Sequence, residues 1–172
     1  MASVTWRRVL LAATSSLLAI GTFGSDASAA AGDDTTLTVR TTEGTVHGVT
    51  GDGVREFKGI PFAAPPVGEL RFEPPAPVVP WLGVLEAVQV RDACPQARRF
   101  NLTEESNVED CLHLNVAVPT RPHSGPRAVL VWFYGGAFVG GSTKLYPIEF
   151  LAREGDLVVV SVNYRLGPLG FM

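Results

Sequence analysis

Glycines cluster in the stretch VWFYGGAFVGG, residues 131–141, where an apolar run ends in Gly135 and Gly136 and a second glycine pair follows. Glycines let a backbone turn sharply and approach a ligand, which leaves successive N–H groups free to point at one oxygen. Two such donors can hold the oxyanion that develops when an ester or amide carbonyl is attacked. On the glycines alone, an ordinary strand-to-loop turn is the favoured interpretation. A phosphate-binding loop does not fit, because the sequence continues GGSTK and places Lys144 at the wrong position.

Two near-continuous apolar runs rich in β-branched residues frame this stretch, AVLVWFY (128–134) and LVVVSVNY (157–164). Such runs are typical of strands that are buried on both faces. Between them, YPIEFLAREG has Pro147 placed for a first helical turn and Gly155 just past the helix end. These elements predict a parallel strand–helix–strand unit of an α/β sheet, and LHLNVAV (112–118) predicts another strand of that sheet. Ligands bind at the carboxyl ends of such strands, which is where the glycines fall.

The chain before this unit contains two segments with different residue patterns. Residues 37–57 show short apolar-polar alternations broken by glycines, which predicts small antiparallel strands joined by tight turns. Prolines dominate residues 58–85 and exclude both helix and central strand. Aromatic and aliphatic residues are interleaved with the prolines, so we expect an extended segment that packs on the fold, with a flexible linker as the alternative.

Composition and charge limit the class of protein. The 172 residues are 46% hydrophobic and 18% charged, which is typical of one globular domain with a sizeable core. A formal net charge of −3, with no block of Lys or Arg, argues against a nucleic-acid surface.

The first residues have the pattern of a signal peptide. Arg7 and Arg8 precede an apolar run over residues 9–20, and the small residues Ala27 to Ala29 would suit a signal peptidase. The apolar run is shorter than the roughly 20 residues that span a bilayer. We therefore expect residues 1–29 to be removed on export, leaving a secreted domain, residues 30–172, with no membrane span.

Cys94 and Cys111 are the two cysteines of the chain. In an exported protein they could form a disulfide that closes a loop of about 18 residues and contributes about 3 kcal/mol of stability. Two unpaired buried thiols are the alternative. A metal site is disfavoured, because neither cysteine has a second Cys or His at ligand spacing, and we expect no metal or cofactor.

Four motifs resemble, in order and spacing, the amino-terminal part of the type-B carboxylesterases. This branch of the α/β-hydrolases includes cholinesterases, bile-salt-activated lipases and bacterial para-nitrobenzyl esterases. The motifs cover nearly all of the chain after the signal segment: GIPFAAPPVGELRF (59–72), EDCLHLNV (109–116), VWFYGGAFVGGS (131–142) and VVVSVNYRLGPLGF (158–171). The resemblance implies the amino-terminal part of an α/β-hydrolase fold, with small antiparallel strands followed by the start of a mostly parallel central sheet.

The resemblance also implies roles for the glycine stretch. The backbone N–H groups of Gly136 and Ala137 would form two arms of the oxyanion hole, with Gly135 permitting the turn. Tyr134 stands where many bacterial esterases of the superfamily have histidine, although cholinesterase-like members also carry tyrosine there. Ala137 replaces a third glycine, so its methyl would narrow the acyl side slightly.

Other matched positions are expected to be structural. The resemblance implies that Cys94 pairs with Cys111 and that Arg71 forms a salt bridge with Glu109 inside the fold. The NYRLG motif that begins at Asn163 would form the scaffold beneath the site. His113, in the LHLN strand, occupies a usually aromatic position and is expected to be a packed side chain, while His47 and His123 are assigned no role.

The loop between the cysteines bears on the substrate. In cholinesterases the matching loop carries a tryptophan that holds a quaternary ammonium, whereas here the loop has no tryptophan. Neutral carboxylic esters are therefore the expected substrates rather than choline esters. Asn101 lies in an Asn-Leu-Thr sequon and could carry a glycan.

The sequence contains no Gly-x-Ser-x-Gly elbow, in which this family carries its nucleophile. Ser142 and Ser161 do not lie in such an elbow. The chain therefore resembles the first third of a longer enzyme, an exported serine carboxylic-ester hydrolase with an oxyanion-hole loop but no catalytic triad. The alternative is a non-catalytic cholinesterase-like binding or adhesion module, or an inactive truncated remnant. In either case we expect residues 30–172 alone to be inactive, and the sequence gives no oligomeric state.

Overall fold

The computed structural model describes residues 37–98 and 104–172, so the predicted signal segment 1–29 and the sequon at Asn101 lie outside the described residues. A small sheet forms first, with the strand order β1-β2-β5. Its first pair is antiparallel and its second is parallel. The strands span Thr38–Arg40 (β1), Thr45–His47 (β2) and Val84–Glu86 (β5). The antiparallel pairing predicted within residues 37–57 is therefore present, with β5 added from the end of the proline-rich segment.

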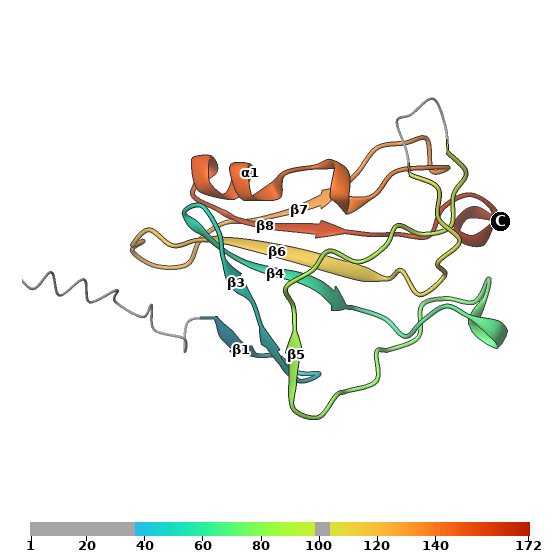
Figure 1. Cartoon of the computed structure of the whole chain (residues 1–172), viewed down its shortest axis with the longest axis horizontal. Helices are drawn as coiled ribbons and strands as arrows, with labels where there is room; N and C mark the ends of the chain where they lie inside the picture. Colours follow the sequence, from blue (N-terminus) through green and yellow to red (C-terminus); the bar gives the residue numbers. More distant parts are fainter. Residues whose placement is uncertain (1–36, 99–103) are drawn as a thin grey trace, which may run out of the picture. The chain divides into compact units, whose positions relative to one another are not determined.

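The larger sheet has the order β3-β4-β6-β8-β7 (Figure 1). Its strands span Val49–Thr50 (β3), Val54–Pro61 (β4), His113–Pro119 (β6), Val129–Phe133 (β7) and Val158–Val162 (β8). In the described chain β7 and β8 form the expected parallel pair, and the other neighbours in this sheet are antiparallel. This sheet brings the end of β7, where the glycines begin, next to the end of β8.

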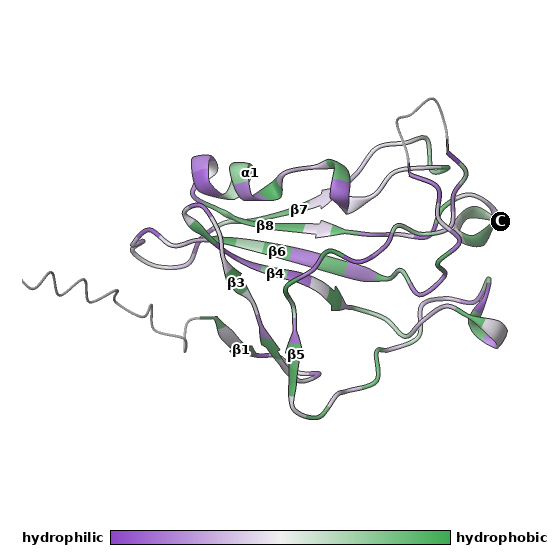
Figure 2. Ribbon diagram, viewed as in Figure 1, coloured by the Kyte–Doolittle hydropathy of each residue, from purple (hydrophilic) through white to green (hydrophobic). Residues whose placement is uncertain are grey.

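Helix α1 spans Ile148–Gly155 and connects β7 to β8. Figure 2 shows hydrophilic and hydrophobic bands alternating along it, as expected for a helix with one buried face. Ile148 and Ala152 pack with Val54, Ala117 and Val159 in a buried cluster between the helix and the sheet. This packing fixes the crossover that holds β7 and β8 in parallel register.

The helix ends differ from the prediction by one residue. Pro147 precedes the first helical residue, and Gly155 is the last helical residue rather than the one beyond it. Asp156 takes the left-handed position at the carboxyl end, with φ 52°, where glycine is the usual residue. Its carboxylate is held there by Arg121 and Arg127, at 2.8 and 3.0 Å.

The prediction that both apolar runs are buried on both faces is wrong for the described chain. Val129 and Phe133 of β7 are 62% and 63% exposed, because β7 is the edge strand of the sheet among the described residues. In β8, Val159 and Ser161 are buried, while the residues that alternate with them are half-buried. The alternation arises because α1 covers one face of the sheet.

The proline-rich segment packs on the fold over part of its length. Its one helical element is a 3₁₀ turn, η2, over Gly68–Leu70. The Trp81 ring lies against the small sheet, and its indole N–H donates to the Thr45 carbonyl at 2.9 Å. Phe72 and Val79, by contrast, are largely exposed. The segment is extended and anchored, as predicted, although its apolar residues are not all buried. The prediction that it holds no central strand is wrong at its start, because β4 continues to Pro61 between β3 and β6, and its prolines become frequent only beyond that point.

Candidate active site

The chain turns sharply where it leaves β7. Gly136, Ala137 and Phe138 have φ values of 144°, 52° and 61°, so three successive residues lie at positive φ. The Gly136 carbonyl closes the turn by accepting from the N–H groups of Val139 and Gly140 at 3.0 and 3.2 Å. A residue other than glycine held in the left-handed region costs on the order of 1–3 kcal/mol. The turn is therefore a strained element that the surrounding structure must hold in place.

Glycine is required at two positions of this turn. A Cβ on Gly136 would lie 1.6 Å from the Gly140 carbonyl oxygen, and one on Gly141 would lie 2.6 Å from the Tyr134 ring. Gly135, which was predicted to permit the turn, has no positive φ, and a Cβ there would meet open space. The backbone freedom that the turn needs therefore lies at Gly136 and not at Gly135.

The N–H groups of Gly136 and Ala137 point to the chemistry this turn can do. None of the hydrogen bonds found between described residues uses either group as a donor. Both residues are exposed, and they line a cavity of about 440 Å³ together with Phe138, Tyr164 and Phe171. Backbone donors beside an open cavity are available to an oxygen of a bound molecule.

Two stacked tyrosines support the turn. The rings of Tyr134 and Tyr164 stack with centroids 4.5 Å apart, and the Tyr164 hydroxyl donates to the Tyr134 carbonyl at 2.5 Å. Burial raises the pKa of Tyr134 to about 12, so its hydroxyl stays protonated at neutral pH. On the next segment, the Gly167 N–H donates to the Phe138 carbonyl at 2.6 Å. The turn is thus anchored to residues that follow β8.

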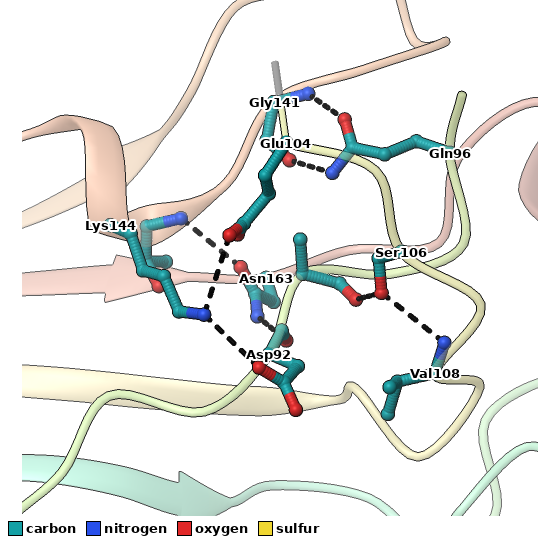
Figure 3. Close-up of polar contacts among 10 residues, drawn as sticks. Asp92, Gln96, Glu104, Ser106, Val108, Gly141, Lys144 and Asn163 are labelled. Atoms are coloured by element: carbon teal, nitrogen blue, oxygen red, sulfur yellow. Dashed lines mark hydrogen bonds and ion pairs between the residues drawn. The ribbon is translucent and has the colours of Figure 1, made fainter. Parts of the chain in front are cut away.

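A second anchor comes from the loop closed by the cysteines (Figure 3). The Gln96 side-chain amide accepts from the Gly141 N–H at 2.7 Å and donates to the Gly141 carbonyl at 2.9 Å. The backbone of Gln96 pairs in turn with Ser106 through N–H to carbonyl bonds of 2.9 and 3.0 Å. This contact ties the end of the glycine stretch to a segment 45 residues earlier in the chain.

Asn163 and Lys144 extend the same network. The Asn163 amide accepts from the Thr143 N–H at 3.2 Å and donates to the Asp92 carbonyl at 3.0 Å. The Lys144 ammonium contacts the carboxylates of Asp92 and Glu104 at 3.1 and 3.4 Å. Burial lowers the pKa of Lys144, but the two carboxylates outweigh that effect and raise it overall. Asn163, expected to be scaffold, is indeed a buried connector beneath the turn.

Cys94 and Cys111 form a disulfide in the structure, with a sequence separation of 17 residues. Both cysteines are fully buried and pack in a cluster that includes Tyr134 and Leu166. The pairing that the resemblance implied therefore lies directly under the candidate site.

Arg71 and Glu109 make a two-point ion pair, with the guanidinium Nε and Nη2 facing the two carboxylate oxygens. The expectation that the pair lies inside the fold is wrong for the described chain, because the Arg71 side chain is 49% exposed. Arg71 directly follows η2 in the solvent-facing part of the proline-rich segment, which keeps the pair near water. The hydrogen bond from Arg71 lowers the pKa of Glu109.

The side chains of Ser142 and Ser161 are buried, that of His113 is largely buried, and none of the three lines the cavity. Ser142 is 1% exposed, and Ser161 is fully buried, where its hydroxyl accepts from the Asn115 amide at 3.2 Å. Neither hydroxyl can therefore meet a substrate in this structure. The His113 side chain is 12% exposed, and burial lowers its pKa, in keeping with a packed side chain.

Over residues 37–98 and 104–172, no group of three or more His, Cys, Asp or Glu side chains is placed to hold a metal ion. The helices in that part of the chain are also too short or too polar to cross a membrane.

Gln96 and Lys144 are the members of the site that sequence reasoning did not identify as functional. The partners of their side chains lie 40 or more residues away in the chain, so no local spacing marks them.

The crossover β7-α1-β8 and the strained turn at the carboxyl end of β7 define the beginning of an α/β-hydrolase fold. The chain belongs to the carboxylesterase family, whose model matches residues 35–172.

Individual relatives agree with this assignment. The para-nitrobenzyl esterase of Bacillus subtilis (strain 168) is 45% identical over 140 residues, covering 78% of this chain and 28% of the relative. The fumonisin B1 esterase of Sphingopyxis macrogoltabida is 45% identical over 150 residues, covering 84% and 27%. The solved structure of a thermophilic pNB esterase superposes with a TM-score of 0.72 at 45% identity, covering 78% of this chain and 29% of the other. The chain thus spans less than a third of the length of these relatives.

Proposed function

We propose that the protein is an exported serine carboxylic-ester hydrolase to which this chain contributes the oxyanion hole. The observation that carries the proposal is that the N–H groups of Gly136 and Ala137 donate no hydrogen bond found within the described chain, while both residues line the cavity. Membership of the carboxylesterase family supports the same chemistry.

In the proposed reaction, the ester carbonyl enters the cavity with its oxygen toward these two N–H groups. As a serine hydroxyl attacks, its proton passes to the histidine, and a tetrahedral intermediate forms whose negative charge lies on the carbonyl oxygen. Collapse of the intermediate breaks the bond to the alcohol, which leaves with that proton, and gives an acyl-enzyme. Water then attacks the acyl-enzyme and releases the acid. Each N–H group that donates to the negatively charged oxygen lowers the barrier by about 2.7–4 kcal/mol.

Residues 1–172 contain no Gly-x-Ser-x-Gly sequence, and Ser142 and Ser161 are buried. The proposal therefore assigns the nucleophile, the acid and the histidine to other residues of the full-length protein. The donors described here act only once that serine lies next to the cavity.

The lining of the cavity supports uncharged esters as substrates. Phe133, Phe138, Tyr164 and Phe171 contribute aromatic surface, and no charged side chain lines the cavity among the described residues. An aromatic lining without a charged side chain favours apolar acyl or alcohol groups, since an anionic group would lose its hydration there without gaining a cationic partner.

Export is the second element of the proposal. The pattern of residues 1–29 supports a cleaved signal peptide, and the buried Cys94–Cys111 disulfide is suited to an oxidising compartment. Intact-mass measurement of protein recovered outside the cytoplasm tests this directly. A secreted species that begins near residue 30 is expected, and a retained, uncleaved chain would contradict export.

The activity is tested with the full-length product of the gene, beginning with the coding DNA downstream of the Met172 codon. A Gly-x-Ser-x-Gly elbow encoded there, hydrolysis of a small p-nitrophenyl ester and labelling of the elbow serine by a fluorophosphonate are the expected results. Absence of the elbow, of labelling and of turnover above a heat-inactivated control would favour a non-catalytic binding or adhesion module.

A further inference from the structure

The Gln96 side chain bonds both backbone groups of Gly141, in the way that a neighbouring strand would. Its oxygen lies 2.7 Å from the Gly141 nitrogen, and its nitrogen lies 2.9 Å from the Gly141 carbonyl oxygen. Gln96 is 9% exposed and Gly141 is buried, so neither backbone group has water as a ready substitute partner. Loss of the amide would leave two buried polar groups unpaired.

The peptide unit that Gln96 binds lies directly against the oxyanion turn. The Gly141 N–H belongs to the same planar peptide as the Gly140 carbonyl, because a peptide bond joins these residues. That carbonyl oxygen packs so closely on Gly136 that a Cβ would lie 1.6 Å from it. The orientation of one peptide plane therefore links the Gln96 amide to the residue whose N–H is the first proposed oxyanion donor.

Gln96 is itself held rigidly enough to serve as a reference point. Its backbone pairs with Ser106, whose hydroxyl donates to the Ala93 carbonyl at 2.6 Å. Cys94, two residues before Gln96, is fixed by the buried disulfide. Because the Gln96 backbone is fixed, its side-chain amide can orient the Gly141 peptide. If that backbone were mobile, the amide would move with the peptide and would not orient it.

We propose that Gln96 is a positioning residue for ester hydrolysis, which aligns the Gly136 and Ala137 donors by fixing the Gly140–Gly141 peptide plane. This inference rests on the function proposed above. It assigns to the disulfide loop a role in the transition state, in addition to its role in the fold.

The oxyanion donors act mainly after the carbonyl has been attacked, so their misalignment lowers kcat more than it raises KM. Displacement of a reacting group by about 1 Å can cost about 100-fold in rate. For Gln96→Met, which keeps the size of the side chain and removes the amide, we expect kcat to fall about 10- to 100-fold with KM changed less than about threefold.

Asn115 provides a matched control. It is also a buried side-chain amide with two bonds, accepting from the Gly59 N–H at 2.9 Å and donating to the Ser161 hydroxyl at 3.2 Å. It lies on β6, and neither of its two bonds reaches the turn. Asn115→Leu is therefore expected to lower the Tm while kcat stays within about twofold of wild type.

The experiment compares full-length wild type, Gln96→Met, Gln96→Glu and Asn115→Leu. It measures kcat and KM with a p-nitrophenyl ester, Ki for a trifluoromethyl ketone that forms a tetrahedral adduct, and the Tm of each protein. We expect the Gln96 variants alone to lose kcat and trifluoromethyl ketone affinity by similar factors. Gln96→Glu keeps an acceptor for the Gly141 N–H but places a carboxylate oxygen against the Gly141 carbonyl oxygen, and their repulsion would push the Gly141 backbone out of its position. It therefore provides a second variant if Gln96→Met does not fold.

Equal kcat and inhibitor affinity in the Gln96 variants and Asn115→Leu would overturn the inference and leave Gln96 a stabilising residue only. Failure of both Gln96 variants to fold, with Asn115→Leu folded, would overturn it in the same way. An inactive wild type would instead overturn the proposed function, and the two failures are therefore distinguishable.

Discussion

Substitution of Gly136 by alanine tests the oxyanion turn most directly. The added Cβ would lie 1.6 Å from the Gly140 carbonyl oxygen, which is at least 1.4 Å closer than the 3.0 Å below which such contacts essentially never occur. The φ of 144° at Gly136 also disfavours any side chain. The turn must therefore open by more than 1 Å, which carries the Gly136 and Ala137 donors away from the carbonyl oxygen. A displacement of this size, or loss of one donor, predicts a fall in kcat of about 100-fold or more, equivalent to about 2.7 kcal/mol.

The assay measures kcat, KM and Tm of full-length Gly136→Ala with a small p-nitrophenyl ester. Gly125→Ala is the matched control, because Gly125 has a φ of 86°, yet a Cβ there would meet nothing within 4 Å. Gly125→Ala should lower the Tm through the positive φ alone, without a steric clash, and should leave kcat unchanged. Gly135→Ala should keep the wild-type Tm, since its φ is ordinary and the space beside it is open. If Gly136→Ala keeps a kcat within about threefold of Gly125→Ala, the assignment of the turn is refuted.

Two further predictions concern stability, and a third concerns the solubility and activity of residues 30–172 alone. Replacing Cys94 and Cys111 together by alanine should lower the free energy of unfolding by about 3 kcal/mol in urea titrations, and an unchanged midpoint would contradict the chain-entropy argument. Burial lowers the pKa of His113 below its usual 6.5, so the unfolded chain binds more protons and stability should fall as the pH drops below about 6.5. His113→Phe should flatten the dependence of Tm on pH in that range, and equal slopes in both proteins would argue against it. Residues 30–172 alone should be poorly soluble and inactive, because β7 exposes Val129 and Phe133; a monomeric, cooperatively melting and active preparation would refute this.

The elements carried by strong local patterns were predictable from the sequence. The apolar runs became β7 and β8, and the amphipathic stretch between them became α1, because periodicity and turn residues act over a few neighbours. Burial was not predictable in the same way. Val129 and Phe133 have the composition of core residues, but their exposure depends on which strand lies beyond β7, and no local pattern records that.

In the candidate site, too, local features were predictable from the sequence and contacts between distant residues were not. The glycine stretch predicted a turn, and only the family resemblance assigned Gly136 and Ala137 as donors. The backbone geometry is what shows that Gly136 rather than Gly135 needs to be glycine. Gln96 could not have been found, since its bond to Gly141 joins segments 45 residues apart and Cys-Pro-Gln has no distinctive spacing. The surface position of the Arg71–Glu109 pair was likewise hidden, because a residue-type pairing does not specify exposure.

The strain in the turn and the anchors around it belong to one arrangement. Ala137 and Phe138, held at positive φ, each cost on the order of 1–3 kcal/mol, so an isolated loop would relax and the two donors would separate. The bonds from Gln96 to Gly141 and from Gly167 to Phe138 hold the two sides of the turn, and each contributes about 1 kcal/mol net. Because strain and anchors are of similar size, removing one anchor should shift the turn before it unfolds the domain. The positions of the Gly136 and Ala137 N–H groups then depend on residues that do not contact the substrate. For this reason the Gln96 variants are expected to lower kcat and not the Tm alone.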